Sequence, residues 1–143
     1  MLQVTQLSKV YEGKIPYRAL TDISLTVDNG EFVCIMGHSG SGKTTLLNII
    51  ATIDEPTTGE VLIKGENPHK LNKNKLAKFR RRELGFVFQD FNLLHTLTVE
   101  ENIILPLTLD NKRVKDMKEK AHAIAETLGI KEVLNKRTYE ISG

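Results

Sequence analysis

The feature that most constrains this chain is the glycine-rich run GHSGSGKT at residues 37–44, which fits the pattern G-x-x-x-x-G-K-[ST]. The segment Glu31–Met36 precedes it and predicts a buried strand, because a nearly continuous apolar run suits a parallel sheet covered on both faces. The segment Lys43–Thr52 follows it and predicts a helix with a broad apolar face. A strand, a glycine-rich loop and a helix in this order predict an α/β fold with a phosphate-binding loop.

The residue types in this loop suit phosphate chemistry. Glycines let the backbone wrap closely around phosphates with its N–H groups directed inward, and the helix N-terminus adds about half a positive charge. Lys43 places a full charge against the β- and γ-phosphates, and Thr44 offers a hydroxyl to Mg²⁺. The alternative is a glycine-rich turn that binds nothing. The apolar strand before the motif and the helix after it favour the phosphate loop.

Periodic segments predict the other elements. The alternation of Ile23, Leu25 and Val27 is typical of a half-buried strand. Further predicted elements are a strand over Leu2, Val4 and Leu7, a strand at Glu60–Lys64, a helix at Asn72–Arg82, a buried strand at Leu84–Phe88, a helix begun by a Thr98/Glu101 capping box, and an amphipathic helix with the apolar stripe Val114, Met117, Ala121, Ile124 and Leu128, capped at Gly129.

Composition excludes several classes of protein. The net charge of +2 does not argue for nucleic acid, and the longest apolar run, Phe32–Met36, has five residues, whereas a membrane span needs roughly 20. The first 14 residues are polar and lack the apolar stretch of a signal peptide. The single cysteine, Cys34, suits a reducing compartment, and its place in an apolar run predicts a buried, inert thiol.

Three other features have an ordinary interpretation that we favour. Glu100 and Glu101 resemble a carboxylate pair, but Glu101 fits the capping box from Thr98. The run from His69 to Arg82 holds seven Lys and Arg and no acid; nucleic acid or anionic lipid is one interpretation, and a solvated helix face is the favoured one. The four histidines, at positions 38, 69, 95 and 122, lack the spacing of metal ligands.

The run GHSGSGKTTLLNII resembles the Walker A segment of ATP-binding cassette (ABC) proteins. Phe86-Val87-Phe88-Gln89 is similar to the family's Q-loop, Tyr11 matches an aromatic residue near the N-terminus, and Glu140-Ile141-Ser142-Gly143 resembles the start of the LSGGQ signature. Residues 86–107, FVFQDFNLLHTLTVEENIILPL, are similar to the lipoprotein-release, macrolide-export and bacitracin-resistance branch, and the bacitracin-resistance type is the nearest likeness.

The resemblance implies a P-loop NTPase (ABC ATPase) core with an antiparallel β subdomain and the start of a helical subdomain, divided into residues 1–89 and 90–143. Tyr11 is expected to stack on adenine, so that Tyr11→Phe would be nearly neutral, and Gln89 to orient the attacking water and contact Mg²⁺. The alternatives are a surface tyrosine and a polar residue ending a strand. The expected ATP-binding residues are Tyr11, Gly37, His38, Ser39, Gly40, Ser41, Gly42, Lys43, Thr44, Thr45 and Gln89, with Lys43 and Gln89 catalytic and Thr44 and Gln89 at Mg²⁺.

Other motifs of the family are expected beyond Gly143: the second signature glycine, the Walker B aspartate, the catalytic glutamate and the switch histidine. The chain is therefore interpreted as the N-terminal part of a longer protein and is expected not to hydrolyse ATP by itself. In the family, two further strands lie between the phosphate-loop strand and the Q-loop strand. Glu31–Met36 and Leu84–Phe88 are thus not expected to be neighbours here.

The resemblance also implies partners. A second ATP-binding subunit would form a homodimer with ATP, and a transmembrane permease would dock near Gln89, Phe91, Leu93 and Leu94. The expected location is cytoplasmic, on the inner face of the cell membrane, with no nucleic-acid partner. Export or detoxification of a peptide antibiotic or a lipid-linked substrate is the expected role, although the permease would set the substrate and the direction of transport.

Three other functions remain open. A soluble ABC ATPase of translation or DNA repair shares the Walker A and Q-loop, but the 53 positions from Gln89 to Ser142 are too few for a long coiled coil. A nucleotide-binding module without turnover is the non-enzyme alternative. A P-loop kinase or GTPase has no reason to combine Tyr11, Gln89 and Ile141-Ser142-Gly143.

Overall fold

The computed structural model describes residues 1–88, 90, 92–109 and 113–141. The chain separates into two compact units, Met1–Phe86 and Val87–Gly143. The boundary expected after residue 89 stays a prediction, since residue 89 lies outside the described residues.

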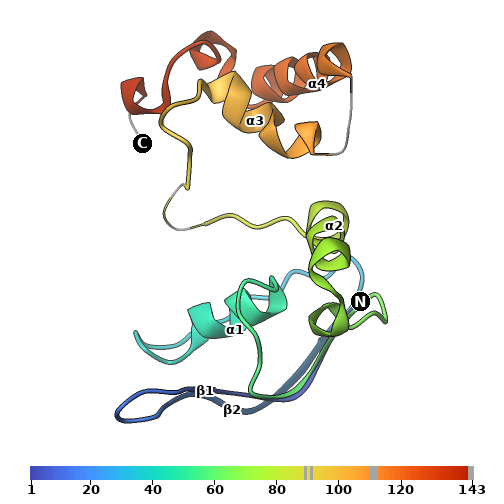
Figure 1. Ribbon diagram of the computed structural model, residues 1–143, viewed down its shortest axis with the longest axis vertical. Coiled ribbons are helices and arrows are strands. Elements are labelled where there is room, and N and C mark those ends of the chain that lie inside the picture. The colour runs from blue at the N-terminus through green and yellow to red at the C-terminus, as the bar shows by residue number, and fades with distance from the viewer. Residues whose placement is uncertain (89, 91, 110–112, 142–143) are drawn as a thin grey trace. The chain divides into compact units, whose positions relative to one another are not determined.

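An antiparallel three-stranded sheet in the order β2-β1-β3 forms the base of the first unit (Figure 1). Val4 in the central strand lies opposite Leu25 on one side and Val61 on the other. The predicted alternation holds, because Ile23, Leu25 and Val27 are half-buried and the residues between them are exposed. The strands are β1 (Leu2–Tyr11), β2 (Tyr17–Val27) and β3 (Thr58–Ile63).

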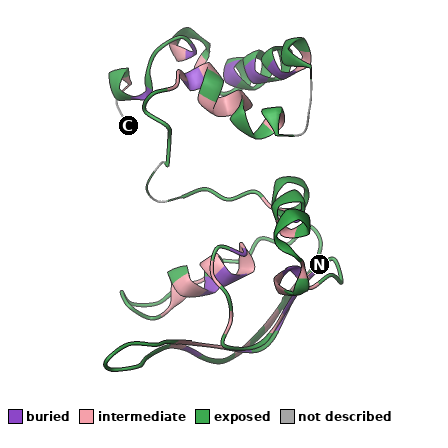
Figure 2. Ribbon diagram, viewed as in Figure 1, coloured by how far each residue is buried: buried purple, intermediate pink, exposed green. Residues whose placement is uncertain are grey.

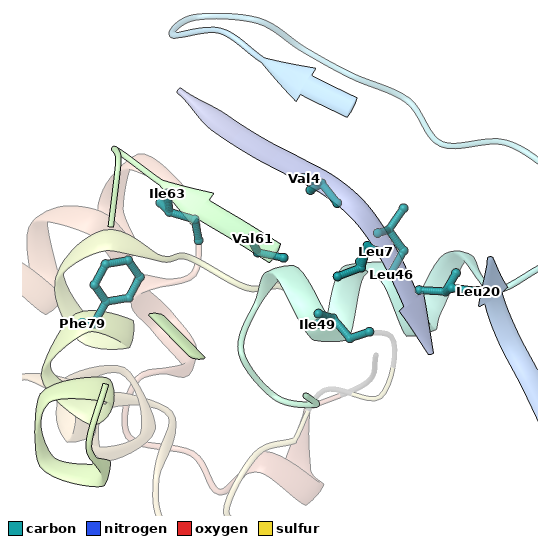
Figure 3. Close-up of a cluster of buried hydrophobic side chains, with 8 residues drawn as sticks. All are labelled: Val4, Leu7, Leu20, Leu46, Ile49, Val61, Ile63 and Phe79. Carbon is teal, nitrogen blue, oxygen red and sulfur yellow. The ribbon is translucent and has the colours of Figure 1, made fainter. Parts of the chain in front are cut away.

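The core of the first unit lies between this sheet and its helices. Leu46 and Ile49 of α1 (Lys43–Ile50) pack beside Leu7 and Leu20 of the sheet (Figure 3). Helix α2 (Lys73–Glu83) adds one buried aromatic ring to the same cluster. Asn72, predicted as the first residue of this helix, is its N-cap, and the Asn72 side chain accepts from the Lys75 N–H. The buried cluster is Val4, Leu7, Leu20, Leu46, Ile49, Val61, Ile63 and Phe79.

The buried strands predicted at Glu31–Met36 and Leu84–Phe88 are wrong, since both segments are irregular. Phe32 and Val87 are each 95% exposed. An apolar run forms a strand only where a neighbouring strand exchanges backbone hydrogen bonds with it. No strand in the described part of the chain pairs with either segment. Cys34 was predicted to be buried, but it is exposed, because its segment has no partner strand among the described residues.

The second unit is helical and has a smaller core. Helices α3 (Val99–Thr108) and α4 (Val114–Thr127) pack together, and the buried cluster contains Val99, Ala125 and Leu134. The predicted capping box is present, because the Thr98 hydroxyl accepts from the Glu101 N–H and the Glu101 carboxylate accepts from the Thr98 N–H. No helix in the described residues is both long and apolar enough to cross a bilayer.

The buried face of α4 differs from the predicted stripe. Met117 and Ala121 are buried as predicted, but Val114, Ile124 and Leu128, which were expected beside them, are exposed, and Ala125 is buried instead. Figure 2 shows both buried and exposed positions along this helix. The buried positions Met117, Ala121 and Ala125 are four residues apart, so they lie on one face of the helix, and this face differs from the stripe of longer apolar side chains. Gly129 has a φ of +70°, as expected for a helix C-terminal cap.

Candidate nucleotide-binding site

The glycine-rich loop leads directly into α1, and Gly42 makes the junction. Gly42 is the N-cap residue and has a φ of +89°, a conformation that other residues rarely adopt. A Cβ atom at this position would lie 2.5 Å from the Ala19 carbonyl oxygen and 2.8 Å from Leu20 Cδ2. Strand β2 therefore contacts the end of the loop so closely that glycine is required, and this contact fixes where α1 begins.

Lys43 closes the loop on itself. Its Nζ donates to the carbonyl oxygens of Gly37 at 2.9 Å and His38 at 2.8 Å, and it lies 3.4 Å from Ser41 Oγ. An ammonium group carries three donors and a full charge, so these acceptors hold the charge at the loop while the residues from Gly37 to Ser41 remain exposed. This is a suitable arrangement for attracting a phosphate group.

The first turn of α1 contributes the remaining polar groups. Thr44 is exposed and Thr45 is half-buried, and no side chain caps the helix. The first N–H groups of a helix have no partner within it, and the helix dipole makes this end electropositive. His38 hydrogen-bonds through Nδ1 to the Ser39 carbonyl oxygen at 2.8 Å, which orients the ring within the loop.

Tyr11 ends β1, and its ring is held by two charged neighbours. Its hydroxyl donates to Asp54 Oδ2 at 2.8 Å, and the Lys9 ammonium lies 4.8 Å from the ring centroid. The side chain is nevertheless 39% exposed. Tyr11 is thus an accessible aromatic ring with a defined orientation rather than an unconstrained surface tyrosine.

Tyr17, which the sequence analysis did not single out, connects this ring to the loop. Tyr17 lies opposite Tyr11 across the hairpin, and its hydroxyl donates to the Gly40 carbonyl oxygen at 3.3 Å. The end of the hairpin that carries Tyr11 therefore adjoins the phosphate loop. The two tyrosines flank a glycine-containing turn, so a predicted hairpin would have placed them opposite each other, but no local pattern links Tyr17 to Gly40, 23 positions away.

Asp54 is the second residue that the sequence analysis missed. Burial raises the pKa of its carboxyl, but hydrogen bonds from Lys9, from Tyr11 and from the Glu55 N–H lower it, and the net effect is a pKa below the ordinary value. The carboxylate therefore stays charged beside Lys9 Nζ, 2.6 Å away. Asp54 is 43 positions from Tyr11, so no local pattern could have linked them.

Some predicted site residues cannot be placed. Gln89 and Phe91 lie outside the described residues. Leu93 and Leu94, predicted to contact a permease with them, are 40% and 49% exposed. The described residues contain no cluster of His, Cys, Asp and Glu arranged to hold a metal ion. Thr44, the residue predicted to contact Mg²⁺, is exposed in the first turn of α1.

The comparisons with known proteins agree with this geometry. A family model described as ABC transporter matches residues 20–143. The chain is 60% identical over 143 residues to the ABC transporter ATP-binding protein YxdL of Bacillus subtilis. This match covers 100% of the chain and 56% of YxdL. It is 46% identical over 144 residues to the bacitracin export ATP-binding protein BceA of Halalkalibacterium halodurans, covering 100% of this chain and 57% of that protein.

A solved structure shows the same fold. The dimeric structure of MJ0796, a bacterial ABC transporter cassette, matches with a TM-score of 0.92 and 37% identity, covering 100% of this chain and 64% of that chain. The chain thus spans less than two thirds of the length of these relatives. The match over residues 20–143 and the shared fold confirm the resemblance seen in the sequence: this chain belongs to the ABC transporter family and has the fold of its ATP-binding cassettes.

Proposed function

We propose that this chain binds Mg-ATP as part of the ATP-binding subunit of an ABC transporter. The observation that carries the proposal is the glycine loop at the start of α1, across which Lys43 Nζ lies within 2.9 Å of two loop carbonyl oxygens. Lys43 would move to the β- and γ-phosphates, and the backbone N–H groups from Gly37 to Gly42 would surround them. The neighbouring cassette MJ0796 has been solved bound to ADP and Pi, which supports a nucleotide as the ligand.

The residue roles follow from this position. Thr44 would contact Mg²⁺, Thr45 would bind phosphate from the first turn of α1, and Tyr11 would stack on adenine. Gln89 would contact Mg²⁺ and orient the attacking water. Phosphoryl transfer depends mainly on positioning and on neutralising charge. In the whole protein these groups would support ATP hydrolysis; for these 143 residues alone we propose binding without turnover.

The transport role is proposed from the relatives. Their names describe bacitracin export, macrolide export and lipoprotein release. We accordingly propose export or detoxification of a peptide antibiotic or a lipid-linked molecule, powered by a pair of ATP-binding subunits on the inner face of the membrane. The permease would dock at the segment that includes Gln89, Phe91, Leu93 and Leu94, where the two leucines are exposed.

The proposal is tested by calorimetric titration of Mg-ATP into the full chain and its Lys43→Ala variant. Loss of the ammonium group leaves the backbone loop but removes the charge-assisted hydrogen bonds, so affinity should fall by about 2 kcal/mol, or about 30-fold. Lys120→Ala removes an exposed lysine of α4 and serves as the matched control, with unchanged affinity. Equal binding by the wild type and Lys43→Ala would contradict the proposal.

A further inference from the structure

The Tyr11 ring belongs to a compact network with Lys9 and Asp54. Lys9 Nζ is 2.6 Å from Asp54 Oδ1 and donates to the Glu55 carbonyl oxygen at 2.7 Å, while the Tyr11 hydroxyl donates to the other carboxylate oxygen at 2.8 Å. The Lys9 and Asp54 side chains are only 12% and 27% exposed. One carboxylate thus holds both the lysine and the tyrosine.

This network determines which part of the ring is accessible. The Lys9 ammonium lies 4.8 Å from the ring centroid, in a cation–π contact with one face. The hydroxyl is fixed at Asp54, so the ring cannot rotate freely about its side-chain bonds. The opposite face remains for an aromatic ligand, and the ordering of the ring is complete before a ligand binds, which lowers the entropic cost of stacking.

The network is also anchored to the helix that begins at the phosphate loop. The Ile53 and Asp54 N–H groups both donate to the Asn48 carbonyl oxygen in α1, at 2.8 and 3.2 Å. Further along, the Thr57 hydroxyl accepts from the Val10 N–H at 2.9 Å in β1. Asp54 therefore connects the ring at the end of β1 to the same helix whose first turn carries Lys43.

We propose that Lys9 and Asp54 are positioning residues for base recognition, which hold the Tyr11 ring with one face presented to the base and at a fixed distance from the phosphate loop. The inference rests on the proposed function, because it assumes that Tyr11 stacks on the base of a bound nucleotide. It also changes the expectation for Tyr11→Phe: the ring remains, but the hydroxyl that orients it is lost, so this variant should bind base less well than the wild type.

The alternative is an ion pair that merely secures the segment after α1. Both roles predict some loss of stability, so the test needs a measurement that responds to the base alone. Inorganic tripolyphosphate offers phosphates similar to those of ATP without ribose or base. The ratio of the tripolyphosphate and ATP dissociation constants, both measured with Mg²⁺ on folded full chain, therefore reports the contribution of the nucleoside.

The variants are Tyr11→Ala as the reference for a lost stack, Lys9→Met and Asp54→Ala for the positioning residues, and Tyr11→Phe for the hydroxyl. We expect Tyr11→Ala to lower the ratio about 10-fold and the other three to lower it about 3- to 5-fold, since each leaves a misplaced ring. Arg80→Met is the matched control. The Arg80 guanidinium donates to the Thr52 hydroxyl at 2.7 Å and so holds the same segment by a contact outside the network, and its loss should lower stability and leave the ratio unchanged.

The outcomes separate the two proposals. If the wild type prefers ATP and Tyr11→Ala loses that preference, while Lys9→Met and Asp54→Ala keep it, the positioning role is wrong and the proposed nucleotide site stands. A change of equal size in Arg80→Met would likewise overturn it in favour of a structural ion pair. If the wild type binds neither ligand, the proposed function fails and this inference fails with it.

Discussion

The two units of this chain are stabilised in different ways. The first unit, Met1–Phe86, has a contiguous cluster of eight buried apolar side chains between a sheet and two helices. Among the described residues of the second unit, Val87–Gly143, the corresponding cluster has three, and two of the residues buried on α4 are alanines. Because hydrophobic stabilisation scales with buried apolar area, the second unit depends more on its polar contacts.

Those polar contacts reinforce the packing of α3 against α4 and attach the segment before α3 to that helix. Asn102 in α3 accepts from the Leu94 N–H at 2.8 Å and donates to the Leu94 carbonyl oxygen at 3.1 Å. Glu100 accepts from His122 at 2.7 Å and from Lys118 at 3.1 Å, which links α3 to α4. From this difference we expect that truncating a core side chain lowers the stability of the first unit most. Single changes to polar side chains should instead lower the stability of the second unit.

The largest effect is expected for Ile49→Ala in α1. Ile49 is fully buried, so truncation removes transfer energy and leaves a cavity, at a cost of about 3 kcal/mol. Hydrogen–deuterium exchange with peptide-level mass spectrometry should show the loss of protection in β1 and α1, with the second unit little changed. Leu47→Ala, on the same helix at 45% exposure, is the control and should cost much less. An equal loss in both units would contradict the comparison.

The fold could be predicted from sequence where the determinants are local. The alternation of Ile23, Leu25 and Val27 predicted the face of β2, and the Thr98/Glu101 spacing predicted the start of α3. The phosphate loop before α1 was predicted because glycines, lysine and helix are contiguous. These signals depend on residues within about one turn or one strand of each other.

The failures concern partners that are distant in sequence. Glu31–Met36 has the composition of a strand, but strand formation depends on a neighbouring strand, which composition does not encode. The buried face of α4 shifted from Ile124 to Ala125 because the packing partner, not the apolar stripe, selects it. In the candidate site, the Asp54–Tyr11 contact joins residues 43 apart, so the chemistry around the ring was found only once the chain was folded.

The second largest effect is expected for Asn102→Ala. This side chain is half-buried, and its removal takes away the oxygen that accepts from the Leu94 N–H. The Leu94 and Thr98 carbonyl oxygens lose one donor each but keep the backbone N–H groups of Leu97 and Asn102, so the change should cost about 1.5 kcal/mol. Urea unfolding followed by hydrogen exchange should show the loss in the second unit. Asn135→Ala, at an exposed asparagine of the same unit, should be nearly neutral. Greater damage at Asn135 would show that the Leu94 contact does not matter.

A smaller effect is expected for Thr98→Ala, which removes the hydroxyl that accepts from the Glu101 N–H at the start of α3. Loss of an N-cap of this kind costs about 1 kcal/mol. Thr127→Ala is the control. The Thr127 hydroxyl bonds back to the Ala123 carbonyl oxygen within α4, and alanine has the higher helix propensity, so this change should be neutral or slightly stabilising. Equal destabilisation by both variants in a urea titration would exclude the capping box as the cause.

The smallest effect concerns the pH dependence of the link between α3 and α4. A hydrogen bond from His122 holds the pKa of Glu100 below its usual value of 4.5; burial opposes this, and Lys118 reinforces it. The unfolded chain therefore binds the proton more tightly, so the carboxylate stabilises the folded unit at pH values above 4.5, and this contribution is lost as the pH falls through the lower, folded-state value. Glu100→Gln should lower the free energy of unfolding by about 0.5 to 1 kcal/mol at pH 7, and the difference from the wild type should disappear in strong acid.

Glu119→Gln is the control. It changes a carboxylate that is 66% exposed and 3.9 Å from Lys115, and it should show neither effect. A Glu100→Gln deficit that persists unchanged at pH 3, measured by urea unfolding, would mean that the glutamate acts through packing rather than through its charge, and the second unit would then resemble the first more closely than its contacts indicate.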